Sequence, residues 1–148
     1  MDPSSEDTLD FLREHLEFCA ANHKKCRPQA RVFPTRLIDV RHTIRLIDRP
    51  SIHLDPPKFL YLSACWGSDF ALRLTHNNEE QLKTEIMLED LPRTVRDAIV
   101  IAKELNVPYI WVDSLCIFQD DLESWNVEVL RMKDYLRSCT FTLGVASS

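Results

Sequence analysis

Glycine is scarce in this chain: there are only two, Gly67 and Gly144, among 148 residues. Loops that cradle phosphate groups need several glycines, because the backbone must approach the anion closely. The sequence therefore contains neither a P-loop nor a dinucleotide-binding fingerprint. A nucleotide bound by this chain would have to rest on side chains and on helix N-termini instead.

Long apolar runs and an export signal are also missing. The longest uninterrupted apolar run, Ala98 to Ala102, is far below the roughly 20 residues that a membrane-spanning helix needs. The first residues, Met1 to Asp7, are polar and acidic, unlike a signal peptide. The chain has five cysteines, and an odd number without an export signal favours free thiols. These absences predict a cytoplasmic protein without a membrane span.

A cluster of basic residues is not evident either. The net charge is −5, from 18 basic and 23 acidic residues, and the basic ones are scattered. This scatter argues against a nucleic-acid-binding surface, and the short basic group from His23 to Lys25 is best explained as a solvated helix end. The composition, 45% hydrophobic and 28% charged, is that of a globular domain.

Residues 1–58 are predicted to form a helix, a strand pair and a linker. Apolar residues at helical spacing indicate an amphipathic helix over 7–21, with Asp7 as its N-cap. Two short apolar-rich runs, Arg36–Val40 and Thr43–Ile47, are predicted to pair as strands. The proline-rich stretch from Asp48 to Lys58 is expected to be a surface linker.

Residues 59–148 are predicted to form an α/β core. Its strands are expected at Leu60–Ser63, Tyr109–Val112 and Phe141–Val145, because these apolar runs suit strands covered on both faces. Two amphipathic helices separate the strands, which predicts a parallel sheet with right-handed crossovers and the first strand in the middle. Three parallel strands are few for this architecture, so we expect further elements beyond Ser148.

The two core helices are predicted from their ends and their apolar stripes. Asp90 is the expected N-cap of the first, with Pro92 in its first turn and Asn106 in the left-handed conformation after its end. Glu128, beside the stripe of the second helix, is expected to be solvated. That stripe, expected to be buried, consists of Leu122, Trp125, Val129, Met132 and Leu136. The six residues chosen as core markers are Leu62, Ile99, Ile110, Trp111, Val112 and Leu143.

Polar residues follow the predicted strands, and parallel strands end at one edge of a sheet, where ligands of open α/β folds bind. Asp113 either contacts a ligand or caps the next turn, and capping is the favoured role. The stretch from Trp66 to Asp69 either holds a nucleotide, by ring stacking and a ribose contact, or is a tight turn. The candidate ligand-binding residues are Ser63, Trp66, Gly67, Ser68, Asp69 and Asp113.

Metal binding and thiol catalysis are not expected. Cys19, His23 and Cys26 have the spacing of one helix face, but zinc prefers four ligands and no fourth is evident nearby. Cys116 lies in an apolar run without a neighbouring base, so it is not expected to be a nucleophile.

Four stretches resemble the HET (heterokaryon incompatibility) domain of fungal proteins. The most specific are Tyr61–Gly67, similar to the family's ALSYCWG signature, and Tyr109–Ile117, which leads to Gln119-Asp120-Asp121. Ala64 departs from the family's usual tyrosine, and Leu136 and Cys139 also differ from the family pattern. The other two stretches run from Cys19 to Val40 and from Leu91 to Ile99.

This resemblance implies a cytosolic domain that triggers cell death on non-self recognition. HET domains in turn resemble TIR domains, whose sheet is flavodoxin-like with helices on both faces, and in which a glutamate on a later helix cleaves NAD. The HET counterpart of that glutamate is expected beyond Ser148. The resemblance therefore implies NAD as a substrate of the intact protein, no tightly bound cofactor, and little turnover by these 148 residues. The alternative is a non-enzymatic module that acts through self-association or protein partners.

Overall fold

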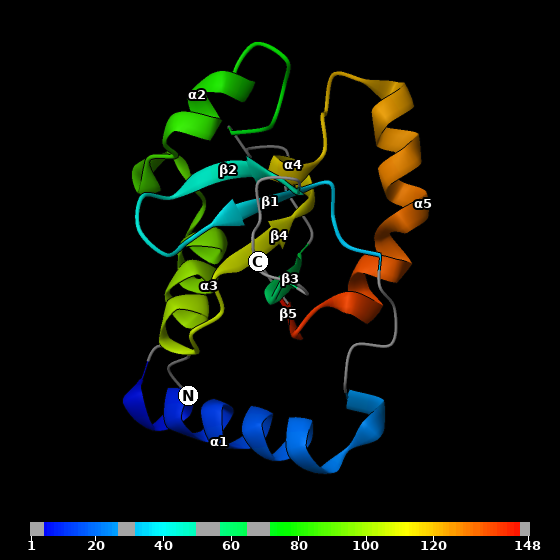
Figure 1. Ribbon diagram of the computed structural model, residues 1–148. Helices are drawn as coiled ribbons and strands as arrows, with labels where there is room; N and C mark the ends of the chain where they lie inside the picture. Colours follow the sequence, from blue (N-terminus) through cyan, green and yellow to red (C-terminus); the bar gives the residue numbers. More distant parts are fainter. Residues whose placement is uncertain (1–4, 27–31, 50–56, 65–71, 146–148) are drawn as a thin grey trace.

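A mixed sheet of five strands, in the order β2-β1-β4-β3-β5, forms the centre of the molecule (Figure 1). The strands β3, β4 and β5 are parallel, and β3 lies between the other two, as the sequence predicts. The computed structural model describes residues 5–26, 32–49, 57–64 and 72–145. The strands are β1 Arg36–Asp39, β2 Arg45–Asp48, β3 Phe59–Ser63, β4 Tyr109–Val112 and β5 Phe141–Gly144.

The predicted strand pair is present and belongs to the same sheet. β1 and β2 form an antiparallel hairpin, whose second strand begins at Arg45 rather than at Thr43. β1 also pairs antiparallel with β4, with Ile38 opposite Ile110. The hairpin therefore extends the parallel core on the β4 side and makes the sheet mixed.

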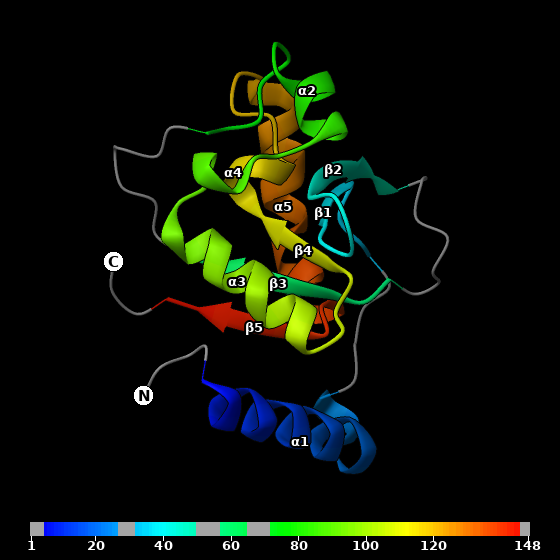
Figure 2. The same ribbon diagram turned by 90° about the vertical axis from the view of Figure 1, so that its left-hand side faces the viewer.

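Helices cover both faces of this sheet. Figures 1 and 2 show α3 on one side of the strands and α5 on the other, which gives three layers. At one end of the sheet α1 crosses below the other elements, where Arg13 Nη2 donates to the carbonyl of Glu104 at 2.9 Å. No helix in the described ranges is long and apolar enough to cross a membrane. The helices are α1 Glu6–Asn22, α2 Glu79–Thr84, α3 Arg93–Glu104, α4 Asp113–Cys116 and α5 Leu122–Ser138, with short 3-10 turns η1 Lys24–Cys26 and η3 Leu88–Asp90.

Two predicted N-caps are wrong. Ser5, not Asp7, caps α1, because its hydroxyl accepts a hydrogen bond from the backbone N–H of Thr8 at 3.3 Å. Asp90 ends the turn η3, and α3 begins only at Arg93. The cause lies in Pro92, because a proline disfavours the helical conformation of the residue before it. Leu91 is accordingly extended, with ψ 143°, and separates the two helical segments.

The left-handed residue after α3 is confirmed, since Asn106 has a φ of 56°. This conformation ends the helix and directs the chain into β4. It is tolerated because asparagine enters the left-handed region more easily than most residues.

The buried face of α5 is not the predicted one. Its side chains nearest the sheet include Glu128 and Tyr135, which are almost fully buried, whereas Leu122 is 75% exposed. Tyr135 sets this rotation, because its ring packs edge-on against Trp111 with the centroids 5.8 Å apart. The predicted apolar stripe consequently lies to the side of the buried face, and Glu128 is buried rather than solvated.

Five of the six core markers are buried as predicted. Leu62, Ile99, Ile110, Trp111 and Val112 are at most 3% exposed. Leu143 is only partly buried, because β5 lies at the edge of the sheet. The alternation of side chains along the strands gives two different cores, one aliphatic towards α3 and one rich in aromatic rings towards α5.

Candidate functional site

The carboxyl ends of the parallel strands meet at one edge of the sheet. Ser63, the last residue of β3, is paired with Gly144 of β5 and is exposed. Asp113 follows β4 directly and is half-buried. Two of the predicted ligand-binding residues thus lie at this edge. Trp66, Gly67, Ser68 and Asp69 lie outside the described residues.

Asp113 is the first residue of the short helix α4, whose N-cap position is Val112, and it makes local hydrogen bonds. Its Oδ1 accepts a hydrogen bond from the backbone N–H of Ser114 at 2.7 Å. Its backbone carbonyl accepts from the N–H of Ile117 at 3.1 Å and from Nε2 of Gln119 at 3.2 Å. These bonds close the short helix α4 and hold the carboxylate at the sheet edge.

Two stacked aromatic rings lie beneath this edge. Tyr61 and Trp111 occupy paired positions on β3 and β4, and their ring centroids are 4.7 Å apart. Burial and the nearby negative charge of Asp113 raise the pKa of Tyr61, so its phenol stays protonated. Trp111 Nε1 and Ser114 Oγ are buried, and neither finds a hydrogen-bond partner within the described ranges. The edge therefore presents the hydroxyl of Ser63 and the carboxylate of Asp113, while both rings, Trp111 Nε1 and Ser114 Oγ lie buried beneath them.

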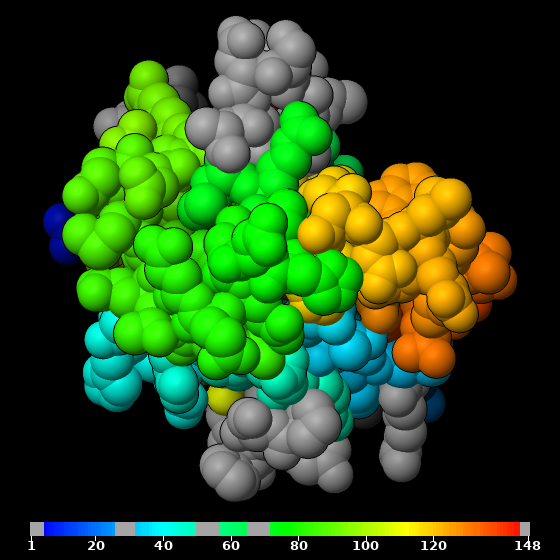
Figure 3. Space-filling view, turned by 90° about the horizontal axis from the view of Figure 1, so that it is seen from above, coloured from blue at the N-terminus to red at the C-terminus, as the bar shows by residue number. Residues whose placement is uncertain are grey.

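The segment after β4 is fixed by hydrogen bonds to the chain that precedes α2. Leu74 donates its N–H to the carbonyl of Ser114, and its own carbonyl accepts from the N–H of Gln119, both at 2.9 Å. His76 stacks on Phe118 with the ring centroids 4.1 Å apart. These two parts of the chain, green and yellow in Figure 3, lie against each other on the surface.

Hydrogen bonds between His76 and Asp120 add to these contacts. His76 Nδ1 lies 3.1 Å from Oδ1 of Asp120, and the backbone N–H of His76 donates to the same carboxylate at 3.1 Å. Asp120 is exposed; desolvation would raise its pKa slightly, but its hydrogen bonds with His76 outweigh this effect and lower that pKa. The segment after β4 is therefore held by three kinds of contact: backbone hydrogen bonds, a ring stack and hydrogen bonds to the carboxylate of Asp120.

A buried glutamate was missed by the sequence-based prediction. The carboxyl group of Glu128 accepts hydrogen bonds from Oγ1 of Thr35 and from the hydroxyl of Tyr135, both at 2.5 Å. Burial, followed by the hydrogen bond to Glu128, raises the pKa of Tyr135 to about 12. A spacing of seven residues places Glu128 and Tyr135 on the same face of α5. That spacing was the only available signal, because Thr35 lies far away in the sequence.

Cys19, Cys26 and Cys116 lie in three different elements, α1, η1 and α4. Cys19 Sγ lies 3.5 Å from Nδ1 of His23, and α1 ends at Asn22, so Cys26 belongs to the separate turn η1. Within the described ranges no group of three or more histidine, cysteine or acidic side chains could hold a metal ion. Cys116 is fully buried, and burial raises the pKa of its thiol to about 12. Such a thiol is a poor nucleophile.

Comparison with known proteins gives one match. The family model described as "Heterokaryon incompatibility protein (HET)" matches residues 59–148. This range is more than half of the chain and contains all three parallel strands and α5. No curated protein and no solved structure matches the chain.

Proposed function

Because this chain belongs to the heterokaryon incompatibility (HET) family, we propose that it is a cell-death effector module of fungal non-self recognition. We further propose that the carboxyl edge of its parallel strands docks a nucleotide, with NAD as the first candidate. The observation that carries this proposal is the position of Asp113 and Ser63 at one edge, above the stacked rings of Tyr61 and Trp111. Ligands of open α/β sheets bind at this position.

Docking and cleavage make different demands on the chain. Cleavage of the nicotinamide–ribose bond needs a carboxylate placed against the positive charge that develops on the sugar. Asp113 is bonded to the backbone of Ser114, and Glu128 is enclosed by Thr35 and Tyr135. We therefore propose that the described residues dock NAD, and that cleavage needs a carboxylate from outside them.

The biochemical test compares two substitutions of aspartate by asparagine. Asp113→Asn keeps an oxygen that can accept from Ser114 but removes the charge, and we expect it to weaken NAD binding measured by calorimetry. Asp10→Asn, on the exposed surface of α1, removes the same charge from a helix that contributes no residue to this edge and should leave binding unchanged. Equal affinities for the two variants would contradict the proposal.

The genetic test addresses the biological role. Asp113→Asn is introduced into the native gene, and cell death is scored when incompatible strains fuse. We expect the substitution to suppress death, whereas Asp10→Asn in the same gene should not. Undiminished death in the Asp113→Asn strain would show that this edge has no part in incompatibility.

Self-association is a second candidate because α5 exposes apolar side chains. Leu122 is 75% and Trp125 40% exposed, and Leu136 on the same stripe is 46% exposed. Apolar residues gathered on one side of a surface helix are typical of a contact with another protein. A second copy of the chain, packed stripe against stripe, would cover them.

A further inference from the structure

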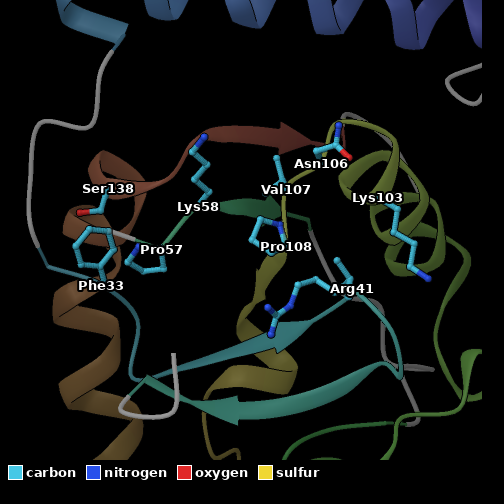
Figure 4. A pocket seen from close by; sticks show the side chains of 10 residues that line it. Phe33, Arg41, Pro57, Lys58, Lys103, Asn106, Val107, Pro108 and Ser138 are labelled. Atoms are coloured by element: carbon cyan, nitrogen blue, oxygen red, sulfur yellow. The ribbon is translucent and has the colours of Figure 1, made fainter. Parts of the chain in front are cut away.

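A cavity of about 750 Å³ lies at the amino ends of the parallel strands, opposite the edge formed by Ser63 and Asp113. Its position follows from its lining, because Lys58 directly precedes β3 and Pro108 directly precedes β4. Figure 4 shows it with α1 passing above. The described residues that line it are Phe33, Val40, Arg41, Pro57, Lys58, Lys103, Asn106, Val107, Pro108 and Ser138.

The apolar wall of this cavity is fixed by the fold. Val40 donates its N–H to the carbonyl of Pro108 at 3.0 Å, and Val107 donates to the carbonyl of Ala102 at 2.8 Å. The ring of Phe33 packs edge-on against Phe59, with the centroids 6.4 Å apart. The wall is therefore formed before any ligand arrives, as is usual for small-molecule sites.

One cation of the cavity is also held in place. The guanidinium of Arg41 donates to both carboxylate oxygens of Asp39, at 3.1 and 2.9 Å, and lies over the ring of Tyr109 at 5.3 Å. Burial alone would raise the pKa of Asp39, but its hydrogen bonds with Arg41 outweigh this effect and lower it. This pairing neutralises one charge while it fixes the position of the guanidinium.

The remaining charge of the lining is positive. Lys58 and Lys103 join Arg41, and no acidic residue occurs among the described residues that line the cavity. Figure 4 shows Lys58 and Arg41 on either side of Pro108, whereas Lys103 is directed away from it. This end of the molecule thus presents an apolar wall beside positive charge, although the chain as a whole carries −5. Such a combination attracts anions and holds their apolar parts.

We propose that this cavity binds a small organic anion with an apolar body. The apolar body lies against Pro57, Val107 and Pro108, and the anionic head group pairs with Lys58. The volume is in the range of roughly 300–1,000 Å³ that is typical of sites for small molecules. An aliphatic and an aromatic carboxylate share this chemistry, and the probes below distinguish them.

The binding test uses two pairs of probes and isothermal calorimetry on the whole chain. One pair is octanoate and 1-octanol, and the other is 2-naphthoate and 2-naphthylmethanol. We expect at least one carboxylate to bind about tenfold or more tightly than its uncharged partner, a difference of about 1.4 kcal/mol. The carboxylate that binds more tightly identifies the shape of the apolar body. Equal binding within both pairs, or no binding of either carboxylate, would overturn the proposal.

A pair of lysine substitutions locates the bound anion. Lys58→Gln removes a charge at the cavity and should weaken carboxylate binding by about twofold to fivefold, the range of one exposed ion pair. Lys133→Gln removes the same charge from an exposed position on α5, outside the lining, and should change nothing. Both lysines are exposed, so neither substitution threatens the fold. An equal affinity of the two variants would place the anion elsewhere and contradict the assignment.

Discussion

Two hydroxyl groups donate to the buried carboxyl group of Glu128, so substitution of this residue tests how much the contact contributes to stability. Glu128→Ala removes the acceptor of both Tyr135 and Thr35. A buried donor without an acceptor costs about 1–3 kcal/mol, so we expect at least that loss in the free energy of unfolding, measured with urea. Glu14→Ala, at an exposed position inside α1, is the control and should stay within about 0.5 kcal/mol of the unsubstituted chain. Equal losses would show that the buried carboxyl group contributes nothing.

Residue chemistry also predicts how stability depends on alkaline pH. The pKa of Cys116 is raised from 9.0 to about 12, and that of Tyr135 from 10.0 to about 12. The folded state holds these protons more tightly than the unfolded state, so stability is complete below pH 9 and falls as the pH rises towards 12. Urea denaturation between pH 8 and pH 11 measures this fall, and Tyr135→Phe should reduce it. A stability that is constant over this interval would contradict the burial of both groups.

At the scale of elements, β4 is the strand on which the sheet depends. It pairs with both β1 and β3, and Ile110 is fully buried between the helices and its neighbours. Ile110→Ala should cost about 2–5 kcal/mol in chemical denaturation, the usual range for such a truncation in a packed core. Val100→Ala, at a 45% exposed position on α3, is the matched control, with an expected change below about 0.5 kcal/mol. A loss at Ile110 as small as that at Val100 would place β4 at the periphery.

The apolar stripe of α5 carries the prediction about self-association. Sedimentation velocity should show a mass that rises above 17.3 kDa with concentration. Leu122→Glu, on the stripe, should restore the monomer without loss of stability, because a glutamate suits the first turn of a helix. Leu130→Glu, on the same helix but off the stripe, should not. A monomer at every concentration would remove this second candidate function.

Elements differ in how well the sequence predicted them, for physical reasons. Strands such as β4 were found because a run of four buried residues in a parallel sheet is apolar throughout. The rotation of α5 was wrong because its buried face is set by Thr35, 93 positions away, and by Trp111. Apolar periodicity cannot reveal a polar residue that is buried through such distant hydrogen bonds.

At the scale of the whole molecule, too, features that follow from local sequence were predictable, and features that depend on distant contacts were not. The edge with Ser63 and Asp113 was predictable, because parallel strands always end together. The cavity beside Lys58 was not, because its wall joins residues before β3 and β4 to the turn after β1. The antiparallel pairing of β1 with β4 brings these residues together, and no local pattern in the sequence predicts that pairing.

Taken as a whole, the 148-residue chain should not release nicotinamide from NAD. The described carboxylates at or near the edge are engaged, Asp113 by Ser114 and Glu128 by Thr35 and Tyr135. Incubation of the purified chain with NAD should therefore match a control without protein. Turnover that is well above this control and is abolished by Asp113→Ala or Glu128→Ala would show that the chain contains its own catalytic carboxylate.

The most direct test of the docking edge is a titration of the isotope-labelled chain with NAD, followed by the amide signals in two-dimensional NMR spectra. The proposal predicts that the largest shifts fall on Ser63, Asp113 and Ser114, and that Asp113→Asn reduces them. The signals of Lys58 and Val107, at the opposite ends of the strands, should move little. Shifts that centre on Lys58 and Val107, or no shifts at millimolar NAD, would contradict the assignment of the carboxyl edge as the nucleotide site.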